Sequence, residues 1–179
     1  MKKNRFSLLL LILSAGVFIS SCEKPKIDVD FDMEVADIYF SIDPTTQTGS
    51  LDLATTTFNS ALQQKLDANS ASIDDVQSIS IIGAQLIMIN PGAQNFDILD
   101  NAYTYLSVPG LAETRIAYRE SIPDGVTSFT LDADAANLKE YLRKSEITFR
   151  VAGFTSGANT ERDSVQAKLS FKIRAEIKK

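Results

Sequence analysis

The chain carries few side chains that do chemistry. It has one cysteine, Cys22, and no histidine, so the commonest general base and the commonest transition-metal ligand are missing. One cysteine without histidine cannot build a Cys/His zinc site. Carboxylates are the plentiful reactive groups, with 23 Asp and Glu against 18 Lys and Arg. They are therefore the first candidates for a site.

Four carboxylates alternate with apolar residues near the start of the chain, at Asp28, Asp30, Asp32 and Glu34. Calcium prefers oxygen ligands, and this spacing resembles the start of a calcium loop. The glycine and the distal glutamate of an EF-hand are missing, however. The alternation also fits the solvated face of an edge strand, where charge hinders aggregation. Whether this acidic row binds calcium is open at the level of sequence.

Two further carboxylate pairs, Asp74 with Asp75 and Asp97 with Asp100, are candidates for acid–base work. They lie at turn-like positions, where Asp is expected to cap the backbone. Nothing in the sequence brings them together in a cleft. We therefore assign no catalytic residue, no metal ligand and no cofactor.

Three tyrosines make the candidate ligand platform: Tyr103, Tyr105 and Tyr118. The first two share one face of a predicted strand, and the third lies on the strand predicted to pair with it as a hairpin. Their rings offer a surface to a sugar or a peptide, although aromatic cross-strand pairs also stabilise ordinary sheets. The expected partner is an envelope protein or a glycan.

The first 21 residues have the layout of a secretory signal peptide. Lys2, Lys3 and Arg5 form a positive head, and an apolar run of about 14 residues extends from Phe6 to Ile19. A transmembrane helix needs about 20 apolar residues, so this run is too short to be one.

The tetrapeptide Ile19-Ser20-Ser21-Cys22 resembles the lipobox of bacterial lipoproteins, in which an aliphatic and two small residues precede an invariant cysteine. The resemblance implies cleavage before Cys22, a diacylglyceryl group on its sulfur and usually an acyl chain such as palmitate on its amino group. Two or three chains on one residue suffice for a stable membrane anchor. Glu23 differs from the Asp that retains such proteins in the inner membrane in enteric-type sorting. The expected location is therefore the outer membrane, facing either the periplasm or the outside.

Cleavage at this point would divide the chain into a signal peptide (1–21), a lipidated N-terminus and tether (22–26) and a single domain (27–179). Residues 22–179 are long enough for one hydrophobic core. Loss of three basic residues leaves 15 Lys and Arg against 23 Asp and Glu, a formal net charge of −8. This charge argues against nucleic acid as a partner, because phosphates need a basic footprint.

Period-two alternation predicts that the domain is mainly β. The clearest strand is Val165–Ile177, and its polar face is basic, with Lys168, Lys172, Arg174 and Lys178. That face would pair with the acidic row if the two strands were neighbours. Further strands are predicted at 27–34, 38–42, 102–108, 114–120, 126–131 and 146–152, with a weak one at 50–54. The segment 38–42 is either a second strand or the strand 27–34 continued after a bend.

The aliphatic run 76–89 predicts a central strand covered on both faces, with a bulge at Gly83. Two helices are predicted, at 58–68 with Thr57 as N-cap and at 134–143 with Asp134 as N-cap. Seven to nine strands with frequent turn signals predict an antiparallel β-sandwich, immunoglobulin-like in type.

The sequence favours a lipid-anchored cell-envelope lipoprotein that acts as a non-enzymatic binding or structural module. Three alternatives stay open. A carboxylate-based glycan hydrolase requires two acids facing one cleft, and a carrier of apolar ligands requires a cavity between the sheets. A surface assembly or adhesin-type subunit requires an unpaired strand edge or an exchanged N-terminal strand.

Overall fold

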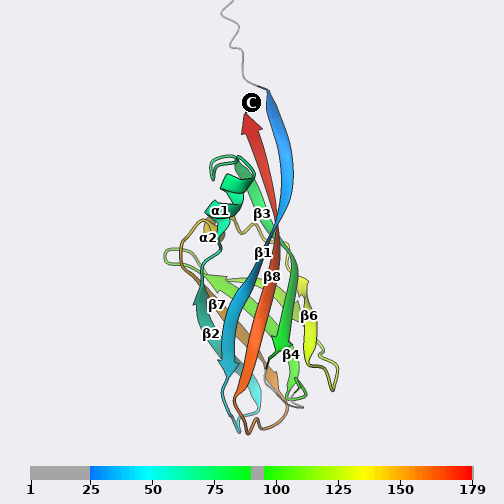
Figure 1. Cartoon of the computed structure of the whole chain (residues 1–179). Coiled ribbons are helices and arrows are strands. Elements are labelled where there is room, and N and C mark those ends of the chain that lie inside the picture. Colours follow the sequence, from blue (N-terminus) through cyan, green and yellow to red (C-terminus); the bar gives the residue numbers. More distant parts are fainter. Residues whose placement is uncertain (1–24, 90–94, 179) are drawn as a thin grey trace, which may run out of the picture.

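A computed structural model describes residues 25–89 and 95–178 (Figure 1). The signal peptide and Cys22 lie outside the described residues, as does the turn that the sequence Asn90-Pro91-Gly92 predicts after the aliphatic run. The prediction of an all-β antiparallel sandwich with two short helices is confirmed. The described elements are β1 (Lys26–Ile42), β2 (Gly49–Phe58), α1 (Leu62–Ala68), β3 (Val76–Met88), β4 (Leu99–Ser107), β5 (Thr114–Arg119), β6 (Ser128–Ala133), α2 (Lys139–Leu142), β7 (Ile147–Thr155) and β8 (Asp163–Lys178).

The strands follow one another in the order β1-β8-β3-β6-β5-β4-β7-β2. The sheet folds over at the short β5/β6 pairing, so that β1-β8-β3-β6 and β5-β4-β7-β2 form two layers (Figure 1). The pairs β1/β8, β2/β7, β3/β6 and β4/β5 are nested, as though one long hairpin had been wrapped into a sandwich. This is a jelly-roll order. Within the sandwich class it differs from the immunoglobulin-like order, in which the first two strands are neighbours.

The core lies between the layers. Phe171 and Leu169 of β8 are fully buried, because β8 is flanked by β1 and β3 and faces the second layer. The rings of Phe40 in β1 and Phe149 in β7 meet across the layers with centroids 6.2 Å apart. The buried apolar side chains of both layers join in one cluster. The space between the sheets is thus occupied by side chains, which gives no support to the apolar-carrier alternative.

The first and last strands are neighbours, as the complementary charge patterns of their polar faces suggested. β1 pairs with β8 over nearly its whole length, and Asp30 lies opposite Arg174. Arg174 Nε donates to Asp30 Oδ1 at 3.3 Å. The segments 27–34 and 38–42 are one strand, with a register shift between Val35 and Ile38. The alternative of a single strand with a bend is confirmed.

The first helix is shorter than predicted. Phe58 is the last residue of β2, where it lies opposite Ile147 of β7 and is buried. The sheet therefore takes Phe58, residues 59–61 connect the strand to the helix, and the weak strand predicted at 50–54 is a ten-residue strand. The predicted N-cap Thr57 is wrong, because α1 begins at Leu62 after Ala61 in the left-handed conformation (φ 53°).

The second helix is also shorter, with only four residues, Lys139–Leu142. Its predicted N-cap, Asp134, instead binds the guanidinium of Arg115 on β5. The helical spacing places four side chains on the buried side of this helix, at Ala135, Leu138, Tyr141 and Leu142. Leu138 and Leu142 are fully buried, Tyr141 is half-buried, and Ala135 is exposed. Because its carboxylate binds Arg115, Asp134 does not cap a helix, and α2 begins five residues later.

The strand β3 is central, and the bulge expected at Gly83 is present as a register shift between Ile81 and Gly83. The prediction that both of its faces are covered is wrong. Ile82 is 48% exposed, whereas its neighbours Ile79 and Ile81 are buried.

Candidate ligand platform on the outer face of β4, β5 and β7

The structure brings the three predicted tyrosines together. Tyr103 of β4 lies directly opposite Tyr118 of β5, and Tyr105 follows two residues later on the same face. The residues between and after them, Thr104 and Leu106, point into the core and are fully buried. The predicted hairpin and the shared face are confirmed, whereas the ligand role stays a prediction.

A bulge decides which residues of β5 join this face. Arg115 and Tyr118 are three residues apart and would point to opposite faces of a regular strand. The register of β5 against β4 shifts beside Tyr105, and Ile116 and Ala117 both turn inward with no exposed surface. The extra residue returns Arg115 to the outer face, where it meets the tyrosines.

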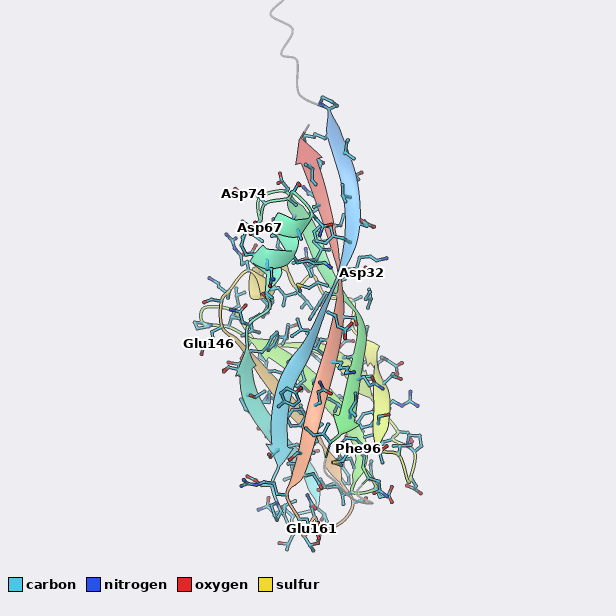
Figure 2. The ribbon with its side chains drawn as sticks, viewed as in Figure 1. Asp32, Asp67, Asp74, Phe96, Glu146 and Glu161 are labelled. Atoms are coloured by element: carbon cyan, nitrogen blue, oxygen red, sulfur yellow. The ribbon has the colours of Figure 1, made fainter. Side chains whose placement is uncertain are left out.

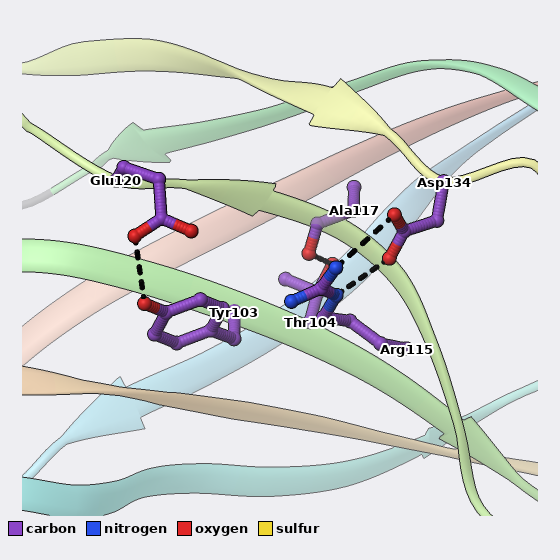
Figure 3. Close-up of polar contacts among 6 residues, drawn as sticks. All are labelled: Tyr103, Thr104, Arg115, Ala117, Glu120 and Asp134. Atoms are coloured by element: carbon purple, nitrogen blue, oxygen red, sulfur yellow. Dashed lines mark hydrogen bonds and ion pairs between the residues drawn. The ribbon is translucent and has the colours of Figure 1, made fainter.

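Arg115 covers part of two rings. Its guanidinium carbon lies 4.5 Å from the ring centroid of Tyr118 and 5.9 Å from that of Tyr103, within the range of cation–π attraction. Asp134 fixes the group from the other side, with Nε donating to Oδ2 at 2.6 Å and Nη2 donating to Oδ1 at 3.3 Å (Figure 3). The hydrogen bond to Asp134 raises the pKa of Arg115.

The hydroxyl of Tyr103 is also held. It donates to Glu120 Oε2 at 3.0 Å (Figure 3). Desolvation raises the pKa of Tyr103 above its ordinary 10, and the bond to Glu120 adds to the rise, because this bond needs the neutral phenol as donor. Tyr103 is thus a fixed neutral side chain.

A second arginine completes the face from β7. The guanidinium carbon of Arg150 lies 4.1 Å from the ring centroid of Tyr105. Arg150 donates to both oxygens of Glu113, at 2.9 Å from Nε and 2.5 Å from Nη2, and also to Asp52 of β2. The hydrogen bond to Glu113 raises the pKa of Arg150 further above its already high ordinary value.

This arrangement has a definite chemical character. Both guanidinium groups are already bound by carboxylates, so the face is not built to capture a phosphate or a carboxylate. The three rings stay half-buried, with part of each exposed. The face therefore presents partly exposed aromatic surface beside polar groups that other side chains hold in place. Alternation within 146–152 places Arg150 on the outer face, but no local signal shows that it lies beside Tyr105. The outward direction of Arg115 depends on the bulge, which alternation does not predict.

The other predicted acidic candidates do not gather into a site. Within residues 25–89 and 95–178, no group of three or more His, Cys, Asp or Glu is placed to hold a metal ion. Asp75 Oδ2 instead accepts bonds from the backbone and the hydroxyl of Ser72, and Asp97 accepts one from the backbone of Gly125. Asp75 thus has the local capping role that its turn position suggested, whereas Asp97 binds a residue 28 positions away. The acidic row Asp28, Asp30, Asp32 and Glu34 lies within these described residues and forms no such metal-holding group, so calcium binding there stays without support.

A pocket of about 590 Å³ lies beside α1 and α2. Ser60 at its wall donates to the backbone carbonyl of Leu142 at 2.8 Å. No carboxylate lines this pocket, so it does not provide the pair of acids that a glycan hydrolase requires. Its lining is formed by Asn59, Ser60, Ala61, Leu62, Gln63, Gln64, Ile73, Leu142, Arg143, Lys144 and Ser145.

Comparison of the chain with protein-family models gives no match, and neither does comparison with curated proteins. In the described part of the chain, neither helix has the length and apolar character needed to cross a bilayer.

Proposed function

We propose that the protein is an exported lipoprotein of the cell envelope, held in a membrane by lipid on Cys22, with the outer membrane as its location. The lipobox-like residues 19–22 carry this proposal. Lys26, where β1 begins, follows Cys22 by four positions, and four residue steps span at most about 14 Å. The lipid would therefore hold the Lys26 end of the sandwich next to the bilayer.

The shape of the domain fits this attachment. β1 and β8 project as a two-stranded ribbon beyond the other strands, and β1 starts at its end (Figure 1). The loops β1–β2 and β7–β8 lie at the opposite pole, joined by a bridge between Thr45 and Asn159. An anchor at the ribbon end would present the long faces of the sandwich and the far loops to partners.

We further propose that the domain is a non-enzymatic binding module, and that the face of Tyr103, Tyr105 and Tyr118 takes an uncharged glycan. Hydroxyl groups both donate and accept hydrogen bonds, so they suit a surface of paired guanidinium and carboxylate groups. The partly exposed rings offer flat apolar surface to the C–H faces of a sugar. Fixed polar groups around an aromatic surface are typical of sites that orient a small ligand.

The anchor is tested by Cys22→Ser in the full chain. We expect loss of palmitate labelling and release from the membrane fraction, with Ser21→Ala as the matched control, because alanine keeps a small residue before the cysteine. A Cys22→Ser chain that stays as firmly in the membrane fraction as wild type would contradict the proposal.

The ligand face is tested by calorimetric titration with neutral envelope-type oligosaccharides. Tyr105→Ala and Tyr118→Ala should weaken binding at least about tenfold, because each removes a ring of the platform. Tyr39→Ala is the control, since Tyr39 is exposed on the other layer. Equal losses in all three variants, or no binding by wild type, would rule out this face.

A further inference from the structure

The first half of β1 leaves one side of its backbone open. β1 ends the sheet, with β8 as its only strand partner in the described part of the chain. Every second residue of an edge strand directs its N–H and C=O groups away from the sheet. Between Lys26 and Val35 these groups form an edge of about 30 Å, at 3.3–3.4 Å per residue.

The inner face of this edge is apolar and incompletely covered. Ile27 is 38% exposed, and Val29 and Phe31 are partly exposed. Their partners on β8 show the contrast, since Ala175 opposite Val29 and Ile173 opposite Phe31 are fully buried. β8 has a strand on each side, whereas β1 has one. A further strand beside β1 would cover the exposed apolar surface.

The outer face of the same edge is acidic beyond what β8 compensates. All four carboxylates of the row 28, 30, 32 and 34 are exposed, and Asp32 points outward from the strand (Figure 2). Asp30 and Asp32 lie opposite the basic Arg174 and Lys172. Asp28 instead lies opposite Glu176, which pairs with Lys26 at 2.6 Å, and Glu34 lies opposite the neutral Ser170. Like charges directly opposite each other destabilise a sheet, so basic side chains on a further strand would relieve this row.

We propose that the β1 edge from Lys26 to Val35 binds an extended segment of a partner protein by strand addition, and that this segment alternates basic with apolar residues. Backbone bonds to the open edge would give affinity, and the alternating side chains would give specificity. β8 shows the matching pattern on the other side of β1, where Arg174 pairs with Asp30. Two copies of β1 would place their carboxylates opposite each other, which disfavours self-pairing.

This inference does not depend on lipidation of Cys22 or on glycan binding. The probe is a fluorescent peptide with the sequence of Lys168–Lys178, titrated into the full-length chain in mild detergent and followed by anisotropy. We expect saturable binding, with slower hydrogen exchange confined to 26–35. Two control peptides carry N-methyl groups, one at the odd and one at the even positions of the same sequence. Each keeps the side-chain charge but loses the N–H donors on one edge of the strand, so the peptide methylated on the edge that faces β1 should fail to bind.

The charge requirement is tested with Asp28→Asn/Asp32→Asn, which should weaken peptide binding about fivefold, since each cross-strand pair contributes roughly 0.2–1 kcal/mol. Asp124→Asn/Glu146→Gln removes two exposed charges elsewhere and should leave the affinity unchanged. Equal binding of both N-methylated peptides, no binding of the parent peptide, or a dimer of the chain that protects 26–35 would overturn the proposal.

Discussion

The guanidinium carbon of Arg150 lies 4.1 Å from the ring centroid of Tyr105, while its nitrogens bind Glu113 and Asp52. One side chain thus connects β7 to the neighbouring strands β4 and β2 and to the loop before β5. The side chain of Arg150 is only 23% exposed, and that of Glu113 is 37% exposed against 69% for Asp52, so the ion pair with Glu113 is the better shielded of the two from solvent. We therefore expect this group to stabilise the sheet as well as shape its outer face.

Arg150→Ala should lower the free energy of unfolding by about 1–2 kcal/mol, because it removes a cation–π contact and leaves two carboxylates without their partner. Urea unfolding followed by circular dichroism measures this change. The control is Arg162→Ala, whose ion pair with Asp43 has both side chains more than two-thirds exposed. We expect a change within about 0.5 kcal/mol there. Equal effects of the two variants would contradict a special role for Arg150.

Gly153→Ala should destabilise the fold by about 1–3 kcal/mol. A Cβ at Gly153 would lie 2.5 Å from the backbone oxygen of Asn101 and 3.2 Å from a methyl of Leu53, so the β4/β7 pairing would have to shift. Gly157→Ala is the matched control, because a Cβ there meets nothing within 4 Å. The midpoint of thermal unfolding should fall only for Gly153→Ala. An unfolding midpoint equal to that of wild type would show that β4 and β7 can move apart at this position without loss of stability.

Asp163 should make stability depend on pH in the direction opposite to most carboxylates. Burial raises the pKa of Asp163 above its ordinary value, although Asn159 Nδ2 donates to it at 2.9 Å. The folded state then holds this proton more tightly than the unfolded state, so the contribution of Asp163 to stability falls as pH rises from about 4 through the raised pKa.

Asp163→Asn removes this titration while keeping a similar shape. The difference in unfolding free energy, wild type minus Asp163→Asn, should decrease as pH increases over that window. Urea midpoints collected from pH 3.5 to 7 give the difference. A difference that grows with pH would mean that the folded state favours the ionised carboxylate.

Phe171→Ala should cost about 3–5 kcal/mol, the usual effect of emptying a large buried aromatic site. Phe171 is fully buried on β8, opposite Met33 of β1 and Ile81 of β3, so its removal opens a cavity beneath the central strands. Leu111→Ala, at an exposed position, should change stability by less than about 0.5 kcal/mol. A small loss for Phe171→Ala would indicate that the layers collapse readily around the gap.

Local patterns in the sequence determined most of the strands and, wherever apolar and polar residues alternate, their buried faces. Burial on one face of a strand repeats every two residues, so the alternation in Val165–Ile177 predicted β8 without any information about its neighbouring strands. The same pattern put Tyr103 and Tyr105 on one face and showed that the acidic and basic faces would complement each other if their strands were neighbours. The lipobox-like residues are likewise a local motif, and the anchor proposed from them needs no fold.

Only the tertiary structure decided which strands are neighbours. Alternation says which side of a strand faces inward but not what lies beside it, so the jelly-roll order and the contact of Arg150 with Tyr105 were not predictable. The start of the first helix was also not predictable, because Phe58 is buried in the sheet opposite Ile147 although its spacing fits a helix. Contacts between residues far apart in the chain overrode local propensity wherever they buried apolar surface or paired a charge.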